Sequence, residues 1–253
     1  MNFKFLSAFV LIGFLYGCKQ TPQHLVKIEG KQISITDSLV ANKALDSFIA
    51  PYRKHIEKDL DSVLSYAKND YSKSDGALNS TLGNFFADAV YAQANPIFNK
   101  RTGKNIDMVL LNHGGIRAIL PKGNITTRTA YQLMPFENSI VVVAMKGNLV
   151  DSLAHYLAKS KKAHPISKLK LYIDSDFEII EAAINGKAID KNKIYYVATN
   201  DYLYNGGDGM TFFKPNDSLY DLNYKVRNAL IDYFKKTDTI NPVIDDRFKQ
   251  KQQ

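Results

Sequence analysis

Cysteine, tryptophan and paired histidines are scarce in this chain of 253 residues. There is one Cys, at position 18, and no Trp. A single thiol excludes an intramolecular disulfide and a cysteine-based metal site. The five His residues are scattered, with no H-x-x-x-H or H-E-x-x-H pair, so no spacing converges on a hydrolytic metal centre. The sequence therefore predicts no metal site.

Motifs for a catalytic nucleophile or a phosphate loop are missing as well. There is no G-x-S-x-G elbow, and "GGDGM" is not followed by the Gly-Lys-Ser/Thr of a Walker loop. Asp201 and Asp208 are too few acids for an EF-hand. "NHGG" faintly resembles the N-H-[DE] motif of metallophosphatases, but Gly114 replaces the acid. We therefore expect His113 to be a strand-end residue and not a metal ligand.

The N-terminus looks like a targeting segment. Lys4 precedes a short apolar run, and residues 15–18, Leu-Tyr-Gly-Cys, resemble the lipobox of bacterial lipoproteins, in which the Cys is lipidated. This predicts a signal peptide over 1–17, lipidation at Cys18, a tether over 18–28, and a lipid anchor at the bacterial cell envelope, on a face that stays open. An ordinary signal peptide with an incidental Cys and a short membrane anchor remain alternatives.

Positive charge is in excess but is not concentrated. The formal net charge is +8, and the densest basic group lies at residues 159–170. We interpret that group as a solvated surface and expect no nucleic-acid polymer as a partner. A mild positive field still suits small phosphate-bearing ligands.

Neither an internal repeat nor a low-complexity linker divides the rest of the chain. We expect one α/β (α+β) domain over 29–253, with a layered mixed sheet and outer helices. The expected elements are a strand or hairpin at 24–36, a helix through Leu45 and Leu60 kinked at Pro51, a helix from 81 ending at Asn95–Pro96, strands at 106–112 and 138–147, a short helix capped by Thr126 or Thr127 and stopped by Pro135, a helix at 148–159, strands at 169–174, 177–186 and 194–200, and a final helix at 222–235.

Polar and aromatic residues follow several of these elements. In "LLNHGGIR", Asn112 comes just after a buried strand, Gly114–Gly115 permits close approach to the backbone, and Arg117 can offer its planar fork to an anion or a hydroxyl pair. In "MPFEN", Phe136 follows a short helix and Asn138 comes two residues later. These residues predict one wall of a ligand site.

The segment "DYLYNGGDG" offers a second wall. Tyr202 and Asp208 flank a tight turn at Gly206–Gly207. Two aromatic side chains on separate loops, with an acid for ribose hydroxyls, could clamp a purine or pyrimidine. The alternatives are that Phe136 fills the core, Tyr202 only packs at a strand end, and the glycines make a hairpin turn.

Together, "GNFFADAV", "LLNHGGIR", "GNIT", "MPFENSIVVVAMKGNLV" and "ATNDYLYNGGDGMTFF" resemble the C-terminal domain of the 5′-nucleotidase family. The resemblance implies a domain that grips a nucleoside, while a separate metallophosphatase domain holds the metal ions and hydrolyses the phosphoester. It implies that Phe136 and Tyr202 stack on the base. It further implies contacts to the base edge, ribose or phosphate from Asn112, Arg117, Asn138 and Asp208.

Two departures from the family pattern qualify this resemblance. "SDGALNSTLGN" lacks the usual arginines, and Asn79 stands where a Glu is expected, so a phosphate- or ribose-side contact is in question. Between Cys18 and the domain there is no room for a metallophosphatase. We therefore expect no cofactor in this chain and divalent metals in a separate metallophosphatase partner. The hypotheses are a split 5′-nucleotidase, a non-catalytic nucleoside- or nucleotide-binding lipoprotein, or a structural lipoprotein with a decayed site.

Overall fold

The computed structural model describes residues 24–251, so the predicted signal peptide and Cys18 lie outside the described residues. The chain divides into two units, with the boundary between Phe48 and Ile49 inside helix α2 (Lys43–Leu60). Pro51 lies inside α2, where the sequence predicts a kink. Within residues 24–251, no helix combines the length and apolar character needed to cross a membrane.

The prediction of a strand or hairpin at residues 24–36 is wrong. These residues are exposed and carry no strand. A strand gains little stability unless its apolar face is buried, and here alternating apolar side chains such as Val26 and Ile33 stay exposed. The helix that follows begins at Lys43, because the Asn42 side chain accepts hydrogen bonds from the backbone N–H groups of Ala44 and Leu45.

A five-stranded mixed sheet forms the centre of the second unit, in the order β10-β4-β9-β2-β5. Its long strands β4 and β9 are antiparallel, and β2 runs parallel to β9. The short strand β2 lies within the apolar run that predicts it. The five strands are β2 (Met108–Leu110), β4 (Ser139–Lys146), β5 (Ile166–Ser167), β9 (Ile194–Asn200) and β10 (Ser218–Lys225).

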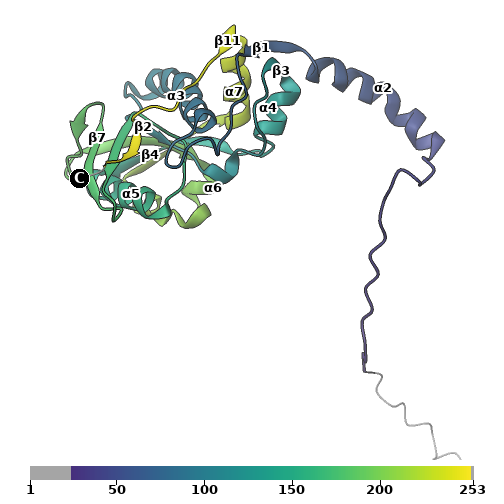
Figure 1. Cartoon of the computed structure of the whole chain (residues 1–253), viewed down its shortest axis with the longest axis horizontal. Coiled ribbons are helices and arrows are strands. Elements are labelled where there is room, and N and C mark those ends of the chain that lie inside the picture. Colours follow the sequence, from purple (N-terminus) through teal and green to yellow (C-terminus); the bar gives the residue numbers. More distant parts are fainter. Residues whose placement is uncertain (1–23, 252–253) are drawn as a thin grey trace, which may run out of the picture. The chain divides into compact units, whose positions relative to one another are not determined.

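Both faces of this sheet are covered, as the alternation along β4 shows. Ile140 and Val142 belong to one core cluster, and Val141 and Val143 belong to another. The first cluster is completed by helices α3 (Thr81–Thr102) and α7 (Val226–Lys235), and the second by helix α5 (Gly147–Ser160). Figure 1 shows α3 and α5 on opposite sides of β2 and β4. The layered mixed sheet with outer helices is therefore confirmed.

Two smaller sheets complete the fold. One has the order β11-β1-β3, and the other has the order β12-β6-β7-β8. Helix α4 (Thr127–Leu133) follows β3 and begins with a capping box in which Thr126 and Thr129 bond reciprocally, as the predicted cap requires. The strands of these sheets are β1 (Val63–Ala67), β3 (Gly123–Thr126), β6 (Leu169–Ile173), β7 (Ile179–Ile184), β8 (Lys187–Ala188), β11 (Thr239–Ile240) and β12 (Phe248–Gln250).

Helix α3 does not end at Asn95–Pro96 but continues to Thr102. Pro96 removes one helical hydrogen bond, yet the next turn carries Phe98, which is fully buried against Tyr196 and Tyr220 at 5.4 Å and 5.3 Å between ring centroids. Burial of this ring offsets the lost bond. The helix ends before Gly103, which adopts a left-handed φ of 71° and whose backbone N–H donates to the Asn99 carbonyl.

The last helix begins at Val226, four residues later than its sequence pattern indicates. Leu222 and Lys225 belong to β10, which pairs with β4, and a register shift lies between Asp221 and Lys225. Asn223 within this shift has a positive φ of 49°. A bulge of this kind interrupts the strand pairing locally. Residues 222–225 therefore belong to an irregular end of β10 and not to the first turn of the helix.

Candidate functional site

The loop after β2 is built around a buried asparagine. Asn112 follows the strand and leads into a short 3-10 turn, η1 (His113–Gly115), so His113 stands just past the strand end. The side-chain oxygen Oδ1 of Asn112 accepts a hydrogen bond from Nδ2 of Asn200 at 3.5 Å. A Cβ on Gly115 would lie 2.9 Å from that same oxygen. The glycine thus makes room for the Asn112 side chain.

The second loop joins α4 to β4 and exposes an aromatic ring. Phe136 is 41% exposed. The Arg117 guanidinium carbon lies 5.7 Å from the centroid of its ring. Two residues on, the Nδ2 of Asn138 donates to Oδ1 of Asp201 at 2.9 Å. This bond ties the Phe136 loop to helix α6 (Asp201–Tyr204).

Helix α6 carries the second exposed ring. Tyr202 is 46% exposed, and its helix is capped by Asn200, whose Oδ1 accepts from the backbone N–H of Leu203 at 2.9 Å. The Tyr202 hydroxyl donates to Oδ1 of Asp208 at 3.0 Å. Both the hydrogen bond to Asp208 and its negative charge raise the pKa of Tyr202, so the phenol stays protonated.

The two glycines after α6, Gly206 and Gly207, have different structural roles. Gly206 has a left-handed φ of 91°, which turns the chain into the 3-10 turn η2 (Gly207–Gly209). A Cβ on Gly207 would lie only 2.4 Å from Cε1 of Tyr202, so the ring packs directly on this glycine. Asp208 is itself held at φ 52°, and its carbonyl accepts from the Tyr156 hydroxyl at 2.8 Å.

These loops enclose one cavity of about 340 Å³. We call it the clamp cavity. The sequence analysis names ten residues for a ligand site. Two of them, Gly206 and Gly207, do not line the clamp cavity, although the Tyr202 ring packs on Gly207. The structure brings the other eight together as its lining: Asn112, Gly114, Gly115, Arg117, Phe136, Asn138, Tyr202 and Asp208.

The lining of the clamp cavity includes one cation, Arg117, and one acid, Asp208. Lys73 lies outside the lining and donates to the carbonyl of Ile116, next to Arg117, at 2.7 Å. Burial and the nearby charge of Arg117 lower the pKa of Lys73. Two exposed aromatic rings together with a cation and an acid suit a ligand that has a flat ring, hydroxyls and an acidic group.

A second cavity of about 460 Å³ adjoins the first and was not anticipated from the sequence. Both cavities are lined by Gly114 and Asp208. Its other lining residues are His113, Tyr156, Ser160, Lys162 and His164. They belong largely to the basic segment interpreted as solvated surface, in which His164 is in fact buried. Burial lowers the pKa of His164 to about 4, so the imidazole is neutral at pH 7.

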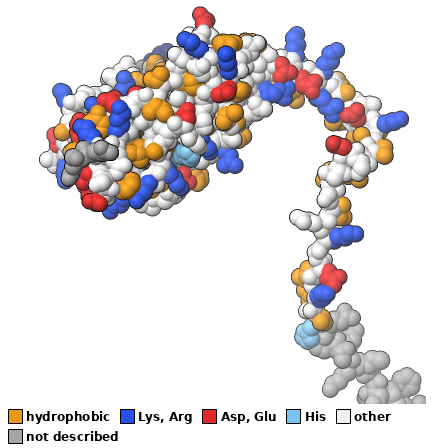
Figure 2. Space-filling view, viewed as in Figure 1, with side chains coloured by type: hydrophobic (Ala, Val, Ile, Leu, Met, Phe, Trp, Pro, Cys, Tyr) orange, Lys and Arg blue, Asp and Glu red, His pale blue; other side chains and the backbone are white. Residues whose placement is uncertain are grey.

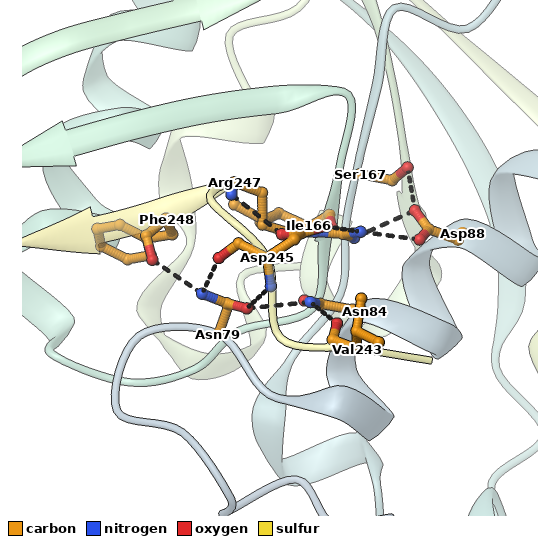
Figure 3. Close-up of polar contacts among 9 residues, drawn as sticks. All are labelled: Asn79, Asn84, Asp88, Ile166, Ser167, Val243, Asp245, Arg247 and Phe248. Carbon is orange, nitrogen blue, oxygen red and sulfur yellow. Dashed lines mark hydrogen bonds and ion pairs between the residues drawn. The ribbon is translucent and has the colours of Figure 1, made fainter. Parts of the chain in front are cut away.

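Asn79, the residue that departs from the family pattern, lies in a structural network (Figure 3). Its Nδ2 donates to the carbonyls of Phe248 at 2.9 Å and Asp245 at 3.2 Å, and its Oδ1 accepts from Asn84 at 3.0 Å. Arg247 beside it bonds both Asp88 and Asp245. Asn79 therefore fastens the C-terminal segment to α3 and does not line the clamp cavity.

One face of the structure carries side chains of both charges. On the face that Figure 2 shows, Lys and Arg side chains are interspersed with Asp and Glu. Across residues 24–251, no three His, Cys, Asp or Glu side chains are grouped so that they could hold a metal ion.

Known proteins with similar sequences include an apyrase, a cell wall protein and a NAD 5′-nucleotidase. The apyrase of Tabanus yao is 27% identical over 179 residues, which cover 63% of this chain and 32% of the apyrase. The cell wall protein Lmo0130 of Listeria monocytogenes is 31% identical over 198 residues, covering 72% of this chain and 24% of that protein. The NAD 5′-nucleotidase of Haemophilus influenzae is 30% identical over 138 residues, covering 47% of this chain and 23% of that enzyme. This chain thus spans a third or less of their lengths.

Solved structures agree on the fold. The 5′-nucleotidase precursor of Thermus thermophilus superimposes with a TM-score of 0.68 at 23% identity, over 81% of this chain and 42% of that one. The NAD nucleotidase of Haemophilus influenzae gives 0.61 at 20% identity, over 84% and 42%. The family model described as "5′-nucleotidase, C-terminal domain" matches residues 63–215, which contain every lining residue of the clamp cavity. Because that match covers more than half of the chain, the protein belongs to the 5′-nucleotidase family and carries its C-terminal domain.

Proposed function

We propose that the clamp cavity binds the nucleoside part of a nucleotide, with the base between Phe136 and Tyr202. The observation that carries this proposal is the convergence of two half-exposed aromatic rings, from segments far apart in the chain, on one cavity. Its volume of about 340 Å³ is within the range of small-molecule sites. Stacking on each ring contributes about 1–3 kcal/mol.

The polar groups around the rings suit the remaining parts of a nucleotide. Asn138 uses its Nδ2 to bond Asp201, and its Oδ1 remains an acceptor for an amino group on the base edge. Asp208 offers carboxylate oxygens to ribose hydroxyls. Arg117 lies just after the turn that follows β2, and Lys73 reaches this turn from the loop before α3; both supply positive charge for a phosphate.

We further propose that this domain supplies the substrate site to a separately encoded metallophosphatase, whose divalent metals catalyse nucleotide hydrolysis. The names of similar proteins, which include a NAD 5′-nucleotidase and a nucleotide phosphoesterase, support a role in nucleotide catabolism. The alternative is a nucleoside- or nucleotide-binding lipoprotein without catalysis. Location at the bacterial envelope through lipidated Cys18 belongs to the same proposal and is supported by the likeness to a cell wall protein.

Isothermal titration calorimetry with adenosine tests the clamp. Phe136→Ala and Tyr202→Ala should each weaken binding by about 1–3 kcal/mol, because each removes one stacking surface. Tyr66→Ala is a matched control, since Tyr66 is 40% exposed and lies on β1. Equal affinity of all four proteins would refute the clamp.

Phosphate release from AMP decides between the two forms of the proposal. The purified chain is assayed with and without a lone metallophosphatase from the same genome, in the presence of Mn²⁺ or Zn²⁺. The split-enzyme proposal requires that the pair release phosphate faster than the metallophosphatase alone. Adenosine binding without any such gain supports the non-catalytic alternative.

Metabolic labelling with palmitate tests the lipid anchor. Equal incorporation of the label into the wild type and into Cys18→Ala would refute lipidation at Cys18.

A further inference from the structure

Three consecutive residues at the junction of β10 and α7 hold the loop that carries Phe136. Lys225 donates from Nζ to the Glu137 carbonyl at 2.6 Å. The backbone N–H of Val226 donates to the Asn138 carbonyl at 3.0 Å. Arg227 bonds the same loop from inside the protein. Three adjacent residues thus fix almost every backbone carbonyl of this loop.

Arg227 makes the most extensive of these contacts. Its side chain is only 5% exposed, and its Nη1 donates to the carbonyls of Met134 and Phe136, both at 3.3 Å. Its Nη2 forms an ion pair with Glu137, and its guanidinium carbon lies 4.0 Å from the ring centroid of Tyr131. A planar guanidinium can satisfy several acceptors at fixed angles, which an ammonium cannot do.

The hydrogen bonds to the carbonyls of this loop restrict its backbone, and a restricted backbone also limits the positions that the Phe136 ring can take. Phe136 has its carbonyl tied to Arg227, while its ring lines the clamp cavity. Asn138 has its carbonyl tied to Val226 and its side chain tied to Asp201, next to Tyr202. The spacing between the two aromatic rings thus depends on Arg227 and Val226 at one end and on Asp201 at the other.

We infer that Arg227 is a positioning residue for the base clamp. It does not line the cavity, and it acts through the backbone of Met134 and Phe136. It also lies beyond residues 63–215, the part matched by the family model, so the family assignment does not predict this role. The inference rests on the proposed function only for its effect on ligand affinity, because the bracing of the loop can be measured without any ligand.

A tryptophan reporter measures the bracing directly. The chain has no Trp, so Phe136→Trp places a single fluorophore on the loop. In this background, Arg227→Lys should increase the amplitude of fast motion in time-resolved anisotropy, since lysine cannot bond both loop carbonyls and Glu137 together. Lys225→Met, which alters a surface side chain, should produce a smaller increase. Unchanged anisotropy in Arg227→Lys, or an increase no larger than that in Lys225→Met, would overturn the inference.

Ligand affinity supplies the second measurement. Arg227→Lys in the otherwise wild-type chain should weaken adenosine binding about tenfold. The matched control is Arg247→Lys, since Arg247 is also largely buried and multiply bonded but holds the C-terminal segment (Figure 3). That control should lower the melting temperature and leave the adenosine Kd within twofold. Equal effects of the two variants on Kd would show a general loss of stability and overturn the inference. If the wild type binds no adenosine, the proposed function fails, while the anisotropy still decides the bracing.

Discussion

Replacing Gly207 by alanine is the sharpest perturbation of the clamp. A Cβ at this position would lie 2.4 Å, 2.5 Å and 2.6 Å from three carbon atoms of the Tyr202 ring. Carbon atoms in contact normally stay about 3.5–4.0 Å apart. The ring must therefore move by about 1 Å or more. Gly207 does not have a positive φ, so the added methyl group acts on the ring and not on the backbone.

The size of the effect has an upper bound. A displaced Tyr202 ring can lose at most its whole stacking contribution, about 1–3 kcal/mol. This corresponds to about 5- to 140-fold in Kd, and the loss in Tyr202→Ala sets the limit. Gly209→Ala is the control in the same turn, because Gly209 has φ 74° and no atom within 4 Å of its would-be Cβ. That variant strains the backbone by about 1–2 kcal/mol without touching the ring.

Calorimetry with adenosine and a double-mutant cycle measure the coupling. Gly207→Ala should weaken binding in the wild type and have almost no effect in the Tyr202→Ala background, where no ring remains to be displaced. The two losses would then be strongly non-additive, as expected for residues in contact. Additive losses would mean that Gly207 acts through the loop and not through the ring, and the steric reasoning would be refuted.

Three further predictions concern His164, Asn79 and Lys73, which lie outside the lining of the clamp cavity. Because burial lowers the pKa of His164 from 6.5 to about 4, its neutral form stabilises the fold fully above pH 6.5. That stability, about 3 kcal/mol at most, should be lost as the pH falls through about 4, and urea titrations of His164→Gln should show a flatter pH dependence. Asn79→Ala should lower the free energy of unfolding by about 1–3 kcal/mol, because the Phe248 carbonyl loses its donor, while adenosine binding stays unchanged by calorimetry. Lys73→Met should weaken AMP binding several-fold and leave adenosine binding within twofold, and equal losses for both ligands would contradict a phosphate contact.

The layers of the fold follow from local patterns. The apolar run at 139–146 could be assigned because β4 is buried on both faces, and the capped helix after Thr126 could be assigned because cap and stop signals are local in sequence. Tertiary packing overrides local signals elsewhere. Pro96 does not stop α3 because Phe98 is buried beyond it, and residues 24–36 form no strand because no surface buries them.

From the sequence, only those residues of the candidate site that directly follow a strand or a helix end can be predicted. Asn112, Phe136 and Tyr202 lie at such places, and the structure gathers them around one cavity. Arg227 carries no comparable signal. It is 91 residues from the Phe136 carbonyl that it bonds, and its own segment reads only as part of an amphipathic helix. The second cavity was missed because a basic segment next to a helix end usually indicates a solvated surface.

The structure also changes the meaning of Asn79. A glutamate at this position could only accept hydrogen bonds when ionised, whereas the Asn79 amide donates to the carbonyls of Asp245 and Phe248. The asparagine is therefore required by the path of the C-terminal segment, and its presence does not by itself indicate a weakened nucleotide site. Arg117 lies on the turn at residues 113–117, and Lys73 reaches that turn from the loop before α3. These two cations are therefore the candidates for the proposed phosphate contact, and the Lys73→Met variant tests one of them.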